Sequence, residues 1–271
     1  MFFDTHAHFD VSQGLGPVAD LVERCHQNDV SRMVAIGGNA KLNESALAAA
    51  ACAPDWVWIA LGYDRDQADT FADADQLEQG MATLERLLAS VPDECKLAAL
   101  GEMGLDYHYD AKTAPAQIEL FRQQLSLARR YRRPVVVHSR EADEDTMTLL
   151  SEHVAAIQAD PEADQAPGVL HCFTGIQTFA EDLVKLGMFI SFSGILTFRN
   201  AEALRTVARY LPEHCLVIET DSPYLAPVPM RGKPNEPHYV RHVCALLAEI
   251  RGKSTDYMAN LTLENGERLF A

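Results

Sequence analysis

Short apolar runs alternate with longer segments along almost the whole chain. The runs are rich in Val, Ile and Phe, whereas the segments between them repeat their apolar residues at helical spacing. Eight runs are predicted to be strands: residues 2–8, 32–37, 57–62, 98–103, 135–138, 169–173, 188–193 and 216–221. The predicted helices include residues 16–28, 74–90, 116–132, 141–158, 238–251 and about 256–269. This alternation is typical of α/β folds with parallel strands.

Eight strand and helix units predict a closed TIM-type (β/α)8 barrel. The chain has 271 residues, 48% of them hydrophobic, and this length suits a single barrel domain over residues 1–271. The alternative is an open doubly wound sheet, which usually has a glycine-rich phosphate turn after its first strand. Gly14 and Gly16 are too sparse to form such a turn. In a barrel, we expect the active site at the C-terminal ends of the strands.

The net charge and the cysteines limit which substrates and which cell compartment are expected for this protein. A formal net charge of -16 argues against a broad basic surface for nucleic acid, so a phosphate-bearing substrate needs a local positive site. The 6 cysteines form no Cys-x-x-Cys pair, which is typical of reduced thiols in the cytosol. No signal peptide and no segment long enough to cross a membrane is evident. We therefore predict a cytoplasmic protein without membrane contact.

The first predicted strand ends in a His-x-His pair. His6 and His8 are two residues apart, so in a strand both imidazoles point to the same side. Both rings can then reach one metal ion at the mouth of a barrel. The alternative for any single histidine is a hydrogen-bonded residue of the core, since histidine is often partly buried.

Further polar residues lie at the ends of other predicted strands. Glu102 ends the fourth strand, His138 ends the fifth, and Asp221 ends the eighth, while His171 lies in the sixth. The predicted metal ligands are therefore His6, His8, Glu102, His138, His171 and Asp221. Imidazole and carboxylate ligands suit two divalent metal ions, such as Mg, Mn or Zn, with Glu102 shared between them.

Six ordered segments resemble the TatD family. They are residues 4–8 (DTHAH), 101–107 (GEMGLDY), 137–142 (VHSREA), 171–175 (HCFTG), 219–225 (ETDSPYL) and 231–237 (RGKPNEP). The resemblance implies a metal-dependent hydrolase with a barrel fold. Several members of the family are deoxyribonucleases, so it also implies a phosphodiesterase that trims DNA ends, with single-stranded DNA as the expected substrate. In the family's motifs, the positions that match the six predicted ligands bind the metals.

One segment departs from the family pattern. After the third strand the family commonly has Gly-x-His-Pro-His, whereas this chain has Gly-Tyr-Asp-Arg-Asp at residues 62–66. Arg65 could contact phosphate in place of a histidine, because its guanidinium binds phosphate oxygens in a bidentate way. The favoured alternative is a surface charge cluster in which Asp64 and Asp66 hold Arg65.

The predicted site suggests roles for several side chains. Two cations would share Glu102 and activate a water molecule, and Asp221 would hold that water and take its proton. Glu219 and Asp4 are expected to orient ligand histidines rather than bind metal. Arg140 and Arg231 are candidate phosphate-binding residues, with structural salt bridges as the equally weighted alternative.

Three functions remain open at this point. The first is a metal-dependent phosphodiesterase, as the resemblance implies. The second is a small-molecule amidohydrolase that cleaves C–N or ester bonds, because one barrel fold hosts many reactions. The third is a metal-binding protein without catalysis, against which the complete ligand set argues. No obligate protein partner is evident, and a monomer is the default expectation.

Overall fold

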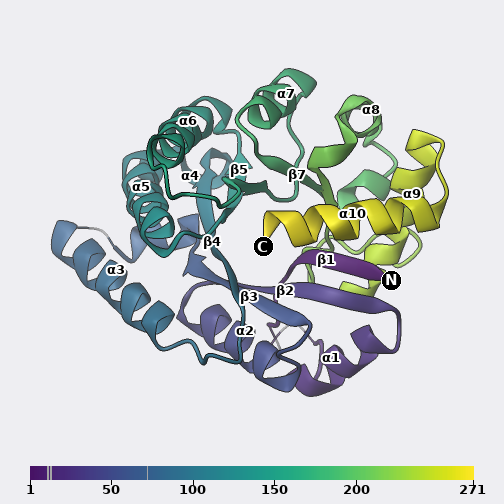
Figure 1. Ribbon diagram of the computed structural model, residues 1–271, viewed down its shortest axis with the longest axis horizontal. Coiled ribbons are helices and arrows are strands. Elements are labelled where there is room, and N and C mark those ends of the chain that lie inside the picture. Colours follow the sequence, from purple (N-terminus) through teal and green to yellow (C-terminus); the bar gives the residue numbers. More distant parts are fainter. Residues whose placement is uncertain (11, 13, 72) are drawn as a thin grey trace.

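Eight parallel strands form one sheet in the computed structural model, which describes residues 1–10, 12, 14–71 and 73–271. The strands are β1 (Phe2–Ala7), β2 (Val30–Gly38), β3 (Val57–Tyr63), β4 (Leu97–Asp106), β5 (Val135–Arg140), β6 (Gly168–Leu170), β7 (Phe189–Phe192) and β8 (Leu216–Ile218). Each strand pairs with the next one along the chain, in the order β1 to β8. The predicted (β/α)8 barrel is therefore confirmed (Figure 1).

Residues that follow β8 close the ring against β1. Ala7 and Ser222 form a parallel bridge. The Asp221 N–H donates to the carbonyl of His6 at 2.9 Å, and the His8 N–H donates to the carbonyl of Ser222 at 2.7 Å. The first and last segments of the barrel are thus joined beside the predicted metal ligands.

Most of the helices surround the ring of strands, whereas the last helix runs across one end of it (Figure 1). They are α1 (Val18–His26), α2 (Ala40–Cys52), α3 (Ala74–Ala89), α4 (Tyr107–Asp110), α5 (Ala114–Tyr131), α6 (Asp143–Ala159), α7 (Gln177–Lys185), α8 (Glu202–Tyr210), α9 (Val240–Arg251) and α10 (Thr255–Leu269). Helix α2 packs on β2 and β3, α5 packs on β4, and α10 packs on β1 and β8. Asn39 begins α2 because its side chain accepts a hydrogen bond from the Leu42 N–H, which would otherwise lack a partner.

The core has two parts, and the inner part fills the barrel at the end where the strands begin. One cluster of buried residues lies between the sheet and the helices, and the other includes Phe3, Trp58 and Phe270. The rings of Phe3 and Trp58 lie 5.4 Å apart, and those of Phe3 and Phe270 lie 6.0 Å apart. Because these aromatic side chains occupy the end where the strands begin, the polar side chains gather at the other end.

The strand boundaries differ from the predicted ones at the site. Strand β4 continues to Asp106 and β5 continues to Arg140, so Glu102 and His138 lie inside strands. Strand β6 ends before His171 and β8 ends well before Asp221. Cys172 has a φ of 46° and Asp221 a φ of 57°, so the backbone turns away from the extended conformation near these ligands.

In the described part of the chain, no helix is both long enough and apolar enough to span a membrane.

Candidate metal centre

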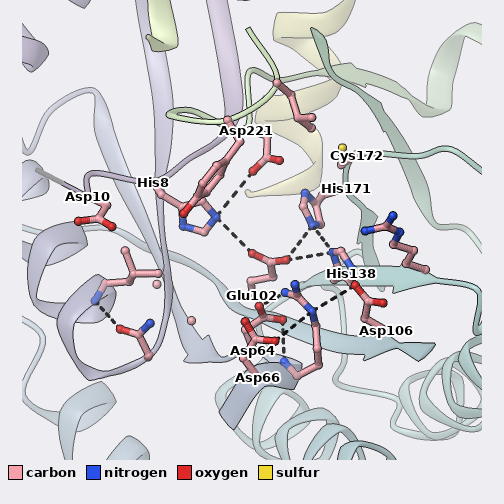
Figure 2. A pocket seen from close by; sticks show the side chains of 18 of the residues that line it. His8, Asp10, Asp64, Asp66, Glu102, Asp106, His138, His171, Cys172 and Asp221 are labelled. Carbon is pink, nitrogen blue, oxygen red and sulfur yellow. Dashed lines mark hydrogen bonds and ion pairs between the residues drawn. The ribbon is translucent and has the colours of Figure 1, made fainter. Parts of the chain in front are cut away.

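A cavity of about 750 Å³ opens at the C-terminal ends of the strands. Its walls include five of the six predicted ligands, His8, Glu102, His138, His171 and Asp221. The sixth, His6, is fully buried and stacks on His171 with 3.9 Å between the ring centroids. Figure 2 shows the side chains of His8, His138, His171 and Asp221 around that of Glu102. The structure thus brings all six residues together.

One group of ligands comes from β1 and the segment after β8. The Nε2 atoms of His6 and His8 lie 3.1 Å apart, so both rings point at the same small volume. Asp221 Oδ1 lies 3.7 Å from each of these nitrogens. These three residues form one group of side chains that could hold a metal ion.

A second group comes from β4, β5 and the residue after β6. Glu102 Oε1 lies 2.9 Å from His171 Nε2 and 3.3 Å from His138 Nδ1. The two imidazole nitrogens are 3.2 Å apart. Three potential ligand atoms therefore converge on a second small volume.

Glu102 connects the two groups. Its Oε2 lies 3.5 Å from His6 Nε2 and 3.3 Å from His8 Nε2, while its Oε1 faces the other histidine pair. Burial would raise the pKa of Glu102, but His171 and His138 outweigh burial and hold that pKa well below its usual range. Glu102 is therefore ionised, and its two oxygens face the two different histidine pairs.

Groups behind the histidines fix the orientation of their rings. His8 Nδ1 lies 3.1 Å from the carbonyl oxygen of Ile36, which can only accept a hydrogen bond. The proton of a neutral His8 is therefore on Nδ1, and the Nε2 lone pair faces the site. His138 Nε2 lies 3.3 Å from Asp106 Oδ2, and His171 Nδ1 lies 3.4 Å from Glu219 Oε1. Such outer partners are typical of histidines that bind metals.

The residues present fit a divalent cation. Two Nε2 atoms that face each other at 3.1 Å repel each other if both carry lone pairs or both carry protons, and a cation between the groups removes the conflict. Burial, together with the nearby His171, lowers the pKa of His6 to about 4, which keeps its imidazole neutral and able to bind a metal. Mixed nitrogen and carboxylate ligands suit zinc and manganese, and magnesium favours the oxygens.

Asp221 differs from Glu102 in its environment. Burial raises the pKa of Asp221 to about 7, although His171 and His8 act in the opposite direction. Its side chain lines the cavity and remains 13% exposed, so water can reach the carboxylate. Asp221 is thus the carboxylate of the first group that faces both the histidines and the open cavity.

Glu219 and Asp4 lie behind the ligands, in different ways. Glu219 Oε1 faces the ring of His171 and also accepts a hydrogen bond from the Cys172 N–H at 2.6 Å. Asp4, in contrast, contacts the backbone N–H of His6 at 3.3 Å rather than its ring. The reason is that the Thr220 N–H and hydroxyl occupy the Asp4 carboxylate at 2.9 and 2.5 Å. Asp4 therefore holds the backbone at the seam of the barrel.

The three predicted phosphate-binding arginines occupy different positions. Arg140 ends β5 and lines the cavity. Arg65 also lines the cavity and pairs closely with Asp64, but only 18% of its side chain is exposed, so the expected cluster is not on the surface. Arg231 is exposed, is not among the described residues that line the cavity, and lies over the ring of Phe198 at 4.1 Å.

Sequence reasoning missed the part played by Asp106. Its Oδ2 lies 3.3 Å from His138 Nε2 and 3.5 Å from Arg65 Nε, with which it forms an ion pair. Strand alternation could have identified it, because residues four apart in a strand point to the same side and Asp106 follows Glu102 by four positions. Asp64 was expected only to hold Arg65 in a surface cluster, yet its carboxylate lies in the cavity wall, and burial, together with Glu102, raises its pKa to about 6.

Comparisons with known proteins extend over the whole barrel. A family model described as TatD related DNase matches residues 3–271. The uncharacterized metal-dependent hydrolase YabD of Bacillus subtilis is 36% identical over 270 residues, which cover 100% of this chain and 99% of that protein. The 3'-5' ssDNA/RNA exonuclease TatD of Erwinia tasmaniensis is 32% identical over 255 residues, 92% of each chain. Among solved structures, YJJV, a TatD homologue from Escherichia coli K12, has a TM-score of 0.84 at 32% identity, covering 99% of this chain and 97% of that one.

Proposed function

The chain belongs to the TatD-related DNase family, and from that membership we propose that it is a divalent-metal-dependent phosphodiesterase that removes nucleotides from the end of a DNA strand. The proposal also takes residues 1–271 as one catalytic domain, because all eight strands belong to one sheet. The TatD relative from Erwinia tasmaniensis, named as a single-stranded DNA and RNA exonuclease, supports the choice of substrate.

The observation that carries the proposal is the position of Glu102 between two histidine pairs. Its Oε2 lies near His6 and His8, and its Oε1 lies near His138 and His171. The Glu102 side chain also lines the cavity. Asp221 completes the first group. Mg, Mn or Zn ions bound to these residues would supply Lewis-acid activation of water and would offset the charge of a phosphodiester.

The side chains of this protein have separable tasks in such a reaction. Asp221 accepts the proton of the attacking water, because its carboxylate lies on the cavity wall next to His6 and His8. Asp106 and Glu219 hold the rings of His138 and His171 in the orientation that metal binding needs.

Cations on the cavity wall would bind the phosphate oxygens. Arg140 and Arg65 line the cavity, and guanidinium groups recognise phosphate through paired hydrogen bonds. Arg231 lies over Phe198 and is not among the described residues that line the cavity, so we propose it for a phosphate farther along the strand. Six carboxylates line the same cavity, Asp10, Asp64, Asp66, Glu102, Asp106 and Asp221, so we expect an anionic substrate to bind only to the metal-loaded protein.

The test is release of nucleotides from end-labelled single-stranded DNA by the purified protein with added Mg or Mn. The matched variant replaces His6 and His8 with alanine, and circular dichroism verifies its fold. Digestion by the native chain alone supports the proposal. Failure of the metal-loaded native chain to digest DNA, combined with hydrolysis of small amides or esters, would reject it in favour of an amidohydrolase. Inactivity on every substrate class would favour a metal-binding protein without catalysis.

A further inference from the structure

Three loops at the mouth of the barrel contain long stretches without a charged residue. Residues 172–176, 193–198 and 222–230 include no Asp, Glu, Lys or Arg, although 23% of the chain is charged. They follow β6, β7 and β8, so they belong to the same end of the barrel as the metal ligands. We refer to these three segments together as the uncharged sector.

Contacts between the segments make the uncharged sector one continuous surface. Cys172 Sγ lies 3.2 Å from Ser193 Oγ, which joins the first segment to the second. The Val228 N–H donates to Thr197 Oγ1 at 2.9 Å, which joins the second to the third. At Gly194, a Cβ atom would lie 2.0 Å from the carbonyl oxygen of Leu225, so only glycine permits this close approach.

The uncharged sector exposes apolar side chains beside the catalytic cavity. Ile176 is 67% exposed, Tyr224 is 48% exposed, and Val228 is 49% exposed. Ile195 and Tyr224 are also part of the cavity wall. Large apolar side chains that remain exposed around a cavity mark a surface that contacts a ligand.

The opposite wall of the cavity, in contrast, is lined by charged side chains. Asp64, Arg65, Asp66, Asp106 and Arg140 line that wall, which is built from the segment that follows β3 and from the ends of β4 and β5. Figure 2 shows the labelled carboxylates of this wall on one side of Glu102 and Cys172 on the other. A substrate that fits both walls must combine a charged part with an apolar part, as a nucleotide does.

Tyr224 is held at a fixed place beside the metal ligands. Its N–H donates to the carbonyl of Asp221 at 2.9 Å, and its own carbonyl accepts a hydrogen bond from the Asn235 side chain at 2.6 Å. The ring centroid lies 6.4 Å from that of His8, with 70° between the planes. The aromatic ring therefore lies next to the centre where the phosphodiester would react.

We propose that the uncharged sector binds unpaired nucleobases next to the scissile phosphodiester, with Tyr224 as the stacking platform. This inference rests on the proposed function and adds that the bases at the end of the substrate strand are unpaired when they bind. A base that stacks on Tyr224 has entered the cavity beside His8, so it has left its pairing partner. Stacking makes use of the face that all bases share, so recognition depends little on sequence.

The experiment compares two short single-stranded oligonucleotides in the presence of Mn. One carries normal bases at its labelled end, and the other lacks the bases of its terminal residues. We expect the native protein to cleave the normal end with a kcat/KM roughly 5-fold to 100-fold higher than the abasic end, in line with the stacking of one base. We expect Tyr224→Ala to lose most of this preference and Tyr224→Phe, which retains the ring, to keep it.

The matched control is Tyr210→Ala. Tyr210 is 67% exposed at the end of α8, on the side of the barrel where β8 begins, and its removal should leave the preference intact. Equal cleavage of normal and abasic ends by the native protein would overturn the inference, and so would an unchanged preference in a folded Tyr224→Ala variant. If the native protein cleaves neither oligonucleotide, the proposed function itself has failed and the inference fails with it.

Discussion

Arg65 and His138 face the same oxygen of Asp106, Oδ2, at 3.5 Å from the guanidinium Nε and 3.3 Å from the imidazole Nε2. Burial would raise the pKa of Asp106, but the hydrogen bonds from His138 and the His108 N–H, together with the charges of His138 and Arg65, outweigh burial and lower that pKa. The ionised carboxylate therefore orients a predicted metal ligand and an arginine of the cavity wall at the same time.

Replacement of Asp106 should weaken metal binding. In Asp106→Asn the side chain keeps its shape but loses the charge that orients His138, so we expect roughly 10-fold to 100-fold lower affinity for the metal that His138 would bind. Calorimetric titration of the metal-free protein with Mn measures this affinity. Asp66→Asn is the control, since Asp66 lies on the same rim with 73% of its side chain exposed. Equal affinity of Asp106→Asn and the native protein would contradict the role of Asp106.

Replacement of Asp221 should stop the reaction and preserve the fold. Asparagine cannot accept the proton of the attacking water, so we expect kcat of Asp221→Asn to fall by at least about 100-fold at saturating metal. Hydrolysis of a chromogenic phosphodiester gives kcat, and circular dichroism verifies the fold. Asp10→Asn is the matched control, because Asp10 also lines the cavity but pairs with Lys41 at 2.9 Å. An Asp221→Asn variant with near-native kcat would exclude Asp221 as the proton acceptor.

Replacement of Asp4 should destabilise the closed barrel. Asp4→Ala removes the acceptor of the Thr220 N–H and hydroxyl, and Thr220 is fully buried. Each unpaired buried donor costs roughly 1–3 kcal/mol, so we expect a loss of about 3 kcal/mol in the free energy of unfolding. Urea denaturation measures this loss. Asp182→Ala, at an exposed ion pair with Lys185, should change the stability by less than about 1 kcal/mol. A comparable loss in both variants would contradict a special role for Asp4.

The stability of the protein should fall in mild acid because of His153. This side chain is fully buried on α6, and burial together with Arg129 lowers the pKa of His153 to about 4. Between pH 6.5 and pH 4 the unfolded chain binds a proton at His153 that the folded chain does not bind, so stability is lost as the pH falls. From these values we expect a loss of about 2 kcal/mol between pH 7 and pH 5.

The His153→Asn variant isolates this contribution. Its side chain can still accept a hydrogen bond from Arg129, which lies 3.1 Å from His153 Nδ1, but it cannot be protonated in this range. The free energy of unfolding of both proteins, measured by urea denaturation at pH 7 and pH 5, should therefore decrease less in the variant. Parallel decreases would show that His153 does not cause the acid sensitivity.

The fold was predictable because buried parallel strands leave a strong local signal. Runs such as residues 57–62 and 135–138 are apolar on both faces of the sheet, and they coincide with β3 and β5 to within a few residues. The ends of β6 and β8 were less predictable. There the backbone turns at Cys172 and Asp221, and the cause is the packing of the barrel mouth rather than the local sequence.

The candidate site was predictable only in part. Residue type and strand position were sufficient to select His6 and Glu102, because imidazoles and carboxylates at strand ends are uncommon in a core. The partners behind the ligands were less predictable. Strand alternation indicates that Asp106 lies on the same side as Glu102, but the contact of Asp106 with His138 and that of the Ile36 carbonyl with His8 arise only in the folded barrel. The same holds for Asp4, whose expected contact with the His6 ring is replaced by a contact with Thr220.

The closure of the barrel by residues after β8 also determines when the centre can form during synthesis. Asp4 and Thr220 are 216 positions apart in the sequence, and contacts of such long range form late because a long loop must close first. On the ribosome, His6 and His8 emerge early, but they cannot be joined by Asp221 until almost the whole chain has been translated. A nascent or prematurely terminated chain that ends before Asp221 therefore lacks one of the six predicted ligands and the contacts that close the barrel, and hydrolytic activity is confined to molecules whose synthesis is nearly complete.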